Sequence, residues 1–184
     1  MNSKNLTFII IMGILGNILF AVSNYAGTII PGVALDFSLI AVYIAGFFGG
    51  PTIGFISGLF AGIFPGIIFG PLGMGSWLGL FGLPLGKAIT GLSAGLISKG
   101  LHLNKKDNSI PLIPVTLLSY IPEGIYTYAY FAFLMPFFLG SEALGSVFII
   151  YILPKAIVEV TIISFLMAAL QGNTGFKDFV SNYF

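Results

Sequence analysis

The sequence predicts an all-α integral membrane protein, a bundle of six transmembrane helices with both termini in the cytoplasm. Only 13 of the 184 residues are charged, which is 7% of the chain, whereas a soluble domain has about 25%. Hydrophobic residues make up 57%, and the mean hydropathy is +1.05. A soluble globule of this composition would have too few polar side chains to cover its surface. We therefore expect residues 1–184 to form a single membrane domain in the plasma membrane.

The composition also excludes several classes of function. The formal net charge is +1 and the lysines are scattered, so no basic patch is expected to bind nucleic acid. The chain has no Cys, which excludes disulfides, thiolate catalysis and zinc–cysteine sites. His102 is the single histidine, so a site with several histidines around a metal or haem is excluded too. We expect no enzymatic activity, no metal and no cofactor.

The membrane spans follow from the gaps between charges. Between Asp36 and Lys87 lie 50 residues without an ionisable group; one helix of that length would extend about 75 Å, far more than the ~30 Å hydrocarbon core. Turn signals at Gly49-Gly50-Pro51 and at the glycine-rich segment 70–75 divide this run. The same criteria predict six helices, over residues 6–24, 36–49, 51–69, 76–98, 111–138 and 143–170.

The lysines outside these spans predict the orientation. Lys4 and the apolar run after it resemble a signal peptide, but five more spans follow, so we expect a retained first helix. The loops at 25–35, 70–75 and 139–142 contain no lysine. The opposite side of the six-helix topology carries Lys4, Lys99, Lys105, Lys106 and Lys177. By the positive-inside rule, both termini are then cytoplasmic.

Glycine recurs at every fourth residue from Gly46 to Gly70. On a helix this spacing places small residues along one face, where another backbone can approach closely. Two interpretations remain open. The face either packs tightly inside the bundle or forms a smooth surface that slides against another helix or subunit.

Four ionisable residues lie well inside the predicted spans, namely Lys87, Glu123, Lys155 and Glu159. Each costs at least ~2.5–3.5 kcal/mol near the bilayer centre. We therefore expect them to face a polar cavity or one another. The simpler alternative is that Lys155 pairs with Glu159 and Lys87 with Glu123, which would only fix the helix register.

Aromatic and hydroxyl side chains extend the same helix faces. Tyr151 lies one turn before Lys155, and Tyr126, Thr127 and Tyr130 follow Glu123. Asn24 and Tyr25 begin an outer loop with glycines at both ends, 27 and 32, which could close over a cavity. Asp36 reads as a helix cap and Asn17 as a hydrogen-bonding residue on an interior helix face.

Two segments resemble a known family. The first is Leu35-Asp-Phe-Ser-Leu-Ile-Ala-Val-Tyr-Ile-Ala-Gly-Phe-Phe-Gly-Gly-Pro-Thr-Ile-Gly-Phe-Ile-Ser-Gly58, and the second is Leu153-Pro-Lys-Ala-Ile-Val-Glu159. They resemble the second, third and sixth helices of the substrate-binding S-components of energy-coupling factor (ECF) transporters. The length and the six expected spans also match this family.

The resemblance implies a protein that captures a water-soluble vitamin or related micronutrient from outside and docks on a transmembrane coupling subunit driven by two cytoplasmic ATPases. Family members dock through small residues on the first helix, often Ala-x-x-x-Ala. That motif is missing here, and the nearest small residues are Gly13, Gly16 and Ala21; the face with Gly54, Gly58 and Gly62 is a second candidate. The family holds its ligand in the outer halves of helices four to six, beneath the first outer loop.

The leading hypothesis is therefore a binding subunit without enzymatic activity. Its aromatic residues would stack on a planar ring, Lys87 and Lys155 would bind a carboxylate or polar oxygens, and Glu123 or Glu159 would bind an amine or ring cation. One alternative is a stand-alone proton-coupled carrier of small molecules, because buried glutamates commonly relay protons. A purely structural role as an assembly factor is a further alternative.

Overall fold

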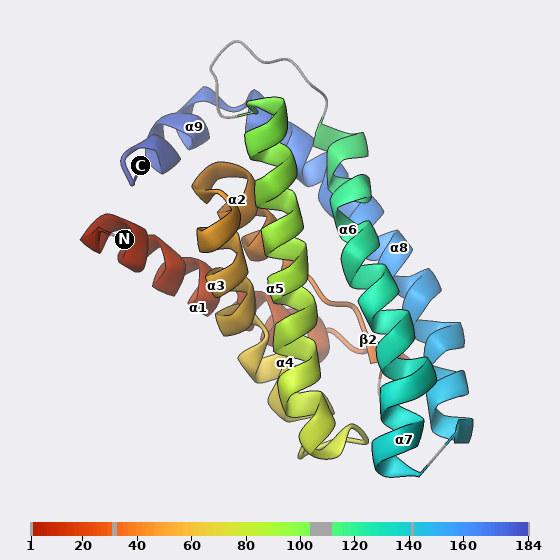
Figure 1. Ribbon diagram of the computed structural model, residues 1–184. Helices are drawn as coiled ribbons and strands as arrows, with labels where there is room; N and C mark the ends of the chain where they lie inside the picture. Colours follow the sequence, from red (N-terminus) through yellow and green to blue (C-terminus); the bar gives the residue numbers. More distant parts are fainter. Residues whose placement is uncertain (1, 31–32, 104–111, 141, 184) are drawn as a thin grey trace.

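The computed structural model describes residues 2–30, 33–103, 112–140 and 142–183, and they are mostly helical (Figure 1). A short antiparallel hairpin of β1 (Thr28–Ile30) and β2 (Val33–Ala34) joins the first two helices. The helical elements are α1 (Ser3–Tyr25), α2 (Leu39–Gly49), α3 (Pro51–Ala61), α4 (Ile63–Phe69), α5 (Ser76–Leu101), α6 (Leu112–Ala129), the π-helical turn η1 (Tyr130–Leu134), α7 (Met135–Leu139), α8 (Glu142–Gly172) and α9 (Thr174–Ser181).

The predicted helical, membrane-embedded character agrees with the length and apolarity of these elements. Four helical segments of the described chain are long and apolar enough to cross a bilayer: Ser3–Tyr25, Pro51–Phe69, Ser76–Leu101 and Gly145–Gly172. The apolar helix α2 is shorter, at 11 residues. The number of crossings and the sides of the termini stay predictions.

Most predicted helix boundaries lie within a few residues of the observed ones. The break at 49–51 is confirmed, because Gly50 has a φ of +87° and Pro51 begins α3; glycine tolerates that conformation and proline suits a first helical position. The predicted span 51–69 is divided at Gly62 into α3 and α4. The predicted span 111–138 corresponds to α6, η1 and α7 in succession.

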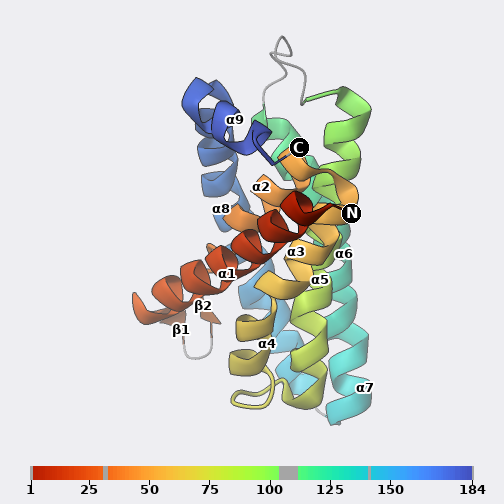
Figure 2. The same ribbon diagram turned by 90° about the vertical axis from the view of Figure 1, so that its left-hand side faces the viewer.

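The helices form two groups on either side of α5 (Figure 1). Helices α1 to α4 lie on one side and α6 to α8 on the other, and α1 crosses the first group obliquely (Figure 2). The two ends of the chain are neighbours: the Lys4 ammonium donates to the Asn182 carbonyl at 3.1 Å. Helix α9 and the C-terminal end of α5 lie toward one end of the bundle, and the α4–α5 turn and α7 lie at the other.

The glycine face of α3 is used inside the bundle. A Cβ atom added to Gly54 would lie 2.3 Å from the carbonyl oxygen of Gly91 on α5, and one added to Gly58 would lie 2.5 Å from that of Lys87. Backbones this close leave no room for any side chain. Of the two interpretations of the glycine repeat, the structure supports internal packing.

Contacts within the chain also involve most of the residues expected to dock the coupling subunit. A Cβ atom on Gly13 or Gly16 of α1 would lie 2.6 Å or 2.5 Å from the Cβ of Phe60 or Ala61 on α3. Gly62 lies as close to Pro84 of α5. Contacts within the chain therefore bury five of the six candidates, Gly13, Gly16, Gly54, Gly58 and Gly62, and only Ala21 is partly exposed.

Asn17 has the interior role that was predicted for it. Its side-chain amide donates to the carbonyl of Phe60 at 2.8 Å, and its oxygen accepts from the backbone N–H of Phe64 at 2.9 Å. These bonds satisfy polar backbone groups where α3 gives way to α4. They connect α1 to α3 and α4 at Gly62, where the predicted helix 51–69 is divided.

Candidate functional site

A cavity of about 300 Å³ lies between the two helix groups. This volume is at the small end of the ~300–1,000 Å³ typical of ligand sites. The residues that line it come from α1, the segment before α2, α2, α4, the α4–α5 turn, α5, α6, η1 and α8. They are Phe20, Asn24, Asp36, Leu39, Ile68, Phe69, Gly73, Met74, Gly82, Leu83, Gly86, Lys87, Tyr120, Glu123, Tyr126, Thr127, Tyr130, Phe131, Phe148, Ile152, Lys155, Ala156 and Glu159. The cavity thus brings together all four ionisable residues that the sequence placed inside the spans.

Lys87 forms the first ion pair of the cavity. It is only 4% exposed, and its ammonium group lies 2.5 Å from the Asp36 carboxylate and 2.5 Å from the Ser38 hydroxyl. The other Asp36 oxygen accepts from the backbone N–H of Ser38 at 2.9 Å. Asp36 does bond to the backbone where α2 begins, as a capping residue would, but its main role is to neutralise Lys87.

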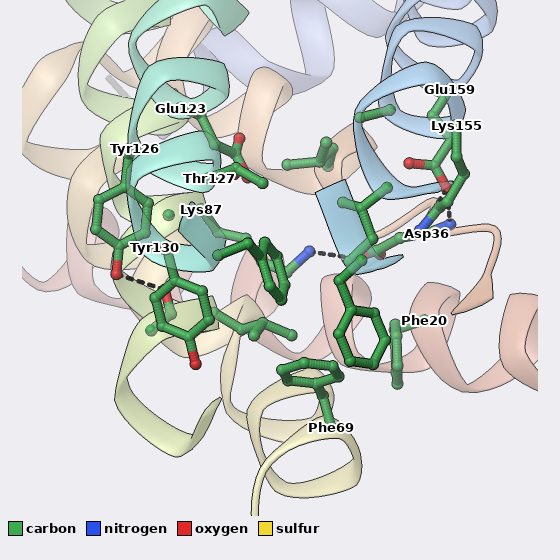
Figure 3. A pocket seen from close by; sticks show the side chains of 18 of the residues that line it. Phe20, Asp36, Phe69, Lys87, Glu123, Tyr126, Thr127, Tyr130, Lys155 and Glu159 are labelled. Carbon is green, nitrogen blue, oxygen red and sulfur yellow. Dashed lines mark hydrogen bonds and ion pairs between the residues drawn. The ribbon is translucent and has the colours of Figure 1, made fainter. Parts of the chain in front are cut away.

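Lys155 and Glu159 form the second ion pair. They lie one turn apart on α8, with 3.2 Å between the ammonium nitrogen and the carboxylate. Glu159 is 2% exposed, and the same carboxylate oxygen accepts the backbone N–H of Asp36. The side chain of Asp36 therefore binds Lys87 on α5, and its backbone N–H binds Glu159 on α8 (Figure 3). These two contacts fix the segment between the hairpin and α2 beside the cavity.

Glu123 differs from the other charged residues of the cavity. Within the described chain no lysine forms an ion pair with it. Of the two pairs in the simpler alternative, Lys155 with Glu159 is therefore observed, whereas Lys87 pairs with Asp36 in place of Glu123. One of its oxygens accepts the hydroxyl of Thr90 on α5. The cavity therefore contains three carboxylates and two lysines, and among the described residues Glu123 is the cavity carboxylate that forms no ion pair.

Tyrosines form the wall beside Glu123 (Figure 3). The Tyr126 hydroxyl donates to the Gly82 carbonyl at 3.1 Å, and the ring centroids of Tyr126 and Tyr130 are 6.1 Å apart. Tyr130 is 3% exposed, and its hydroxyl has no hydrogen-bond partner among the described residues. Glycine on α5 makes room for this ring, because a Cβ atom on Gly82 would lie 2.2 Å from it.

Proline lies next to or near the charge on each of the three principal cavity helices. Pro84 precedes Lys87 by three residues on α5, Pro122 adjoins Glu123 on α6, and Pro154 adjoins Lys155 on α8. A proline inside a helix removes one backbone hydrogen bond and disturbs the preceding turn. The π-helical turn η1, a form often found at functional sites, begins at Tyr130.

Two of the residues expected in the site lie elsewhere. Tyr151 is 47% exposed and does not line the cavity, although it precedes Lys155 by one turn. Tyr25 is 93% exposed, whereas its neighbour Asn24 does line the cavity. Glu123, Tyr126, Thr127 and Tyr130 share one face as predicted.

Sequence reasoning missed three kinds of contributor. It assigned Asp36 only to a cap, it did not include Tyr120, and it did not foresee the apolar floor formed by Phe69, Phe131 and Phe148. The rings of Phe69 and Phe148 pack edge to face with centroids 5.4 Å apart. The one available signal for Asp36 was that a lone carboxylate precedes 50 residues without charge.

The role of the cavity has to be inferred from its own residues, because comparison with known proteins finds no relative whose function could be transferred. No protein-family model, no curated protein and no solved structure matches this chain. Among the described residues, no group of three or more His, Cys, Asp or Glu side chains is placed to hold a metal ion. The cavity therefore has aromatic walls, two ion pairs and one carboxylate, that of Glu123, which accepts a hydrogen bond from a hydroxyl and forms no ion pair with a described residue.

Proposed function

We propose that this protein is the substrate-binding S-component of an ECF-type transporter. In this role it binds a water-soluble, vitamin-like small molecule from outside the cell for ATP-driven uptake by its partners. The observation that supports the proposal most is the cavity, because it gathers five charged side chains and several aromatic rings inside an apolar helical bundle. Such charges are costly in lipid unless they serve a site or pair with one another.

The proposal includes six crossings of the cell membrane with cytoplasmic termini. Three lysines of the described chain support the orientation: Lys4 contacts the C-terminal segment, Lys99 lies in the last turn of α5, and Lys177 lies in α9. Lys105 and Lys106, which also entered the sequence prediction, lie outside the described residues. In this orientation the α4–α5 turn, which borders the cavity through Gly73 and Met74, faces outward.

Partner subunits are a necessary part of this proposal. A transmembrane coupling subunit and two cytoplasmic ATPases would supply the energy, since no soluble ATP-binding domain is expected from the sequence. The coupling subunit would not dock on the glycines at 13, 16, 54, 58 and 62, because these are covered by neighbouring helices of the same chain.

Uptake in proteoliposomes tests the proposal. The chain is reconstituted with a coupling subunit and two ATPases, and uptake of the molecule that copurifies with it is followed with and without ATP. We expect uptake that needs ATP and every subunit. Uptake by this chain alone would contradict the proposal.

A proton-coupled carrier is the second candidate, and one observation favours it. Glu123 is a carboxylate inside the bundle that forms no ion pair with a described residue, which suits a residue that binds and releases a proton. This candidate predicts uptake by the chain alone, driven by a pH gradient and abolished by Glu123→Gln. The two candidates therefore differ in whether ATP or a proton gradient drives transport.

A further inference from the structure

The cavity lysines are already engaged, which limits what the ligand can be. Lys87 contacts both Asp36 and Ser38 at 2.5 Å, and Lys155 lies 3.2 Å from Glu159. An anionic ligand would have to share one of these ammonium groups with the carboxylate that already neutralises it, or replace that carboxylate. Sharing places two negative charges beside one lysine, and replacement leaves a buried carboxylate without its partner, so both are unfavourable.

Glu123 is free to accept more hydrogen bonds. An ionised carboxylate offers about four acceptor positions, and Glu123 accepts one side-chain hydrogen bond within the described chain, from the Thr90 hydroxyl. Glu123 lines the cavity, and Gly86 beside it on α5 has no side chain to cover the carboxylate, which an added Cβ would already touch at 3.4 Å. A positively charged group can therefore approach Glu123 within the cavity without displacing a lysine.

The tyrosines next to Glu123 suit a cation as well. Tyr120, Tyr126 and Tyr130 all line the cavity, and the faces of aromatic rings attract amines and ring cations. Tyr130 lies seven residues after Glu123, about 10 Å further along the helix at ~1.5 Å per residue. Its buried hydroxyl, which has no partner among the described residues, offers a second polar group further along the same wall.

We infer that the ligand carries a net positive charge, as an amine or a heteroaromatic cation, and that this charge pairs with Glu123 while an aromatic ring of the ligand lies against the tyrosines. A polar group at the other end of the ligand then meets Tyr130. The inference rests on the proposed function, since it names the ligand class of the same site. This ligand class is narrower than the one expected from the sequence, in which Lys87 and Lys155 would also bind a carboxylate or polar oxygens of the ligand.

Small aromatic probes of matched shape test this inference. One set is 1-methylnicotinamide (cation), nicotinamide (neutral) and nicotinate (anion), and a second is benzylammonium, benzyl alcohol and benzoate. Binding to the full chain in lipid nanodiscs is measured by calorimetry. We expect each cation to bind about 10- to 100-fold more tightly than its neutral counterpart, because only the cation gains a charge–charge attraction to Glu123, and we expect the anions to bind most weakly.

Substitutions then assign the preference to Glu123. Glu123→Gln is expected to remove the preference for cations while the neutral probes still bind. Asp178→Asn is the matched control, because it also removes one negative charge but lies on the exposed surface of α9. It should leave the preference unchanged. If Glu123→Gln does not fold, the ranking of the probes by the unmodified chain decides alone.

Three results would overturn the inference: neutral or anionic probes that bind as tightly as the cations, a cation preference that survives Glu123→Gln, or no binding of any cationic probe at millimolar concentration. None of these decides the proposed function. ATP-dependent uptake with the partner subunits would still stand if the ligand proved neutral or anionic, and the absence of that uptake would reject the proposed function whatever the probes show.

Discussion

The two faces of α5 use glycine for opposite purposes. Toward α3, Gly91 meets Gly54 so closely that an added Cβ on Gly91 would lie 2.1 Å from the opposite carbonyl oxygen. Toward α6, Gly82 instead leaves space that the ring of Tyr130 enters. The first face brings two backbones together and the second accommodates side chains of a cavity. Small residues in a membrane helix therefore do not by themselves distinguish a packing surface from a binding site, whereas nearby charges do.

The largest effect is expected where the two faces meet, at Lys87. Its backbone carbonyl lies against Gly58 of α3, and its side chain neutralises Asp36 in the cavity. Lys87→Met should destabilise the protein by about 3–5 kcal/mol, because a buried carboxylate loses its partner. Denaturant unfolding in detergent measures this loss. The double variant Lys87→Met/Asp36→Asn should recover much of it, and equal stability of the single and double variants would contradict the assignment.

A smaller loss is expected on the packed face. Gly54→Ala places a Cβ atom 2.3 Å from the carbonyl oxygen of Gly91, so the helices must separate at a cost of about 3 kcal/mol. Gly100→Ala is the matched control, because it lies on the same helix as Gly91 with no atom within 4 Å of the added Cβ. Thermal unfolding should show a lower midpoint for the first variant alone. Equal midpoints would mean that the glycine face is not tightly packed.

The cavity face should respond to the same substitution in a different way. Gly82→Ala displaces the ring of Tyr130, which costs about 1–3 kcal/mol of stability and weakens ligand binding as well. Gly86→Ala is expected to be milder, because its Cβ would lie 3.4 Å from both Glu123 and Tyr126. Calorimetry with the 1-methylnicotinamide probe compares the two. A greater loss of binding in Gly86→Ala than in Gly82→Ala would contradict the close packing of Tyr130 against Gly82.

The smallest effect is expected from single hydroxyl groups. Tyr130→Phe removes the one buried phenol of the wall without a partner among the described residues, so binding of the copurified ligand should weaken by about 2- to 10-fold with little change in stability. Tyr151→Phe is the control, since Tyr151 lies outside the cavity. The comparison fails if both variants bind alike.

Much of the fold follows from the sequence because glycine, proline and the gaps between charges mark the helix ends. Three features were not predictable in this way. The division at Gly62 depends on Asn17, which bonds to Phe60 and Phe64 from another helix. The hairpin and α9 are short elements whose pattern is weak, and α9 is held by contacts such as the one between Phe48 and Phe176, with ring centroids 5.4 Å apart.

The residues of the site were predicted in part, from the cost of charge in lipid and from helical spacing. The cost of charge in lipid identified all four ionisable residues within the spans, and helical spacing placed Tyr126, Thr127 and Tyr130 beside Glu123. The same spacing failed for Tyr151, which is exposed and lies outside the cavity although it precedes Lys155 by one turn. The pairing of Asp36 with Lys87 joins residues 51 positions apart, and no local pattern encodes such a contact.

The central claim is that this cavity binds a small molecule, and native mass spectrometry tests it most directly. The chain is purified in lipid nanodiscs and released in the spectrometer with its bound molecules. We predict one additional small-molecule mass per chain, absent from Gly82→Ala and retained in Gly100→Ala. Lipid and detergent masses alone, together with no saturable binding across a panel of vitamins, would contradict the account.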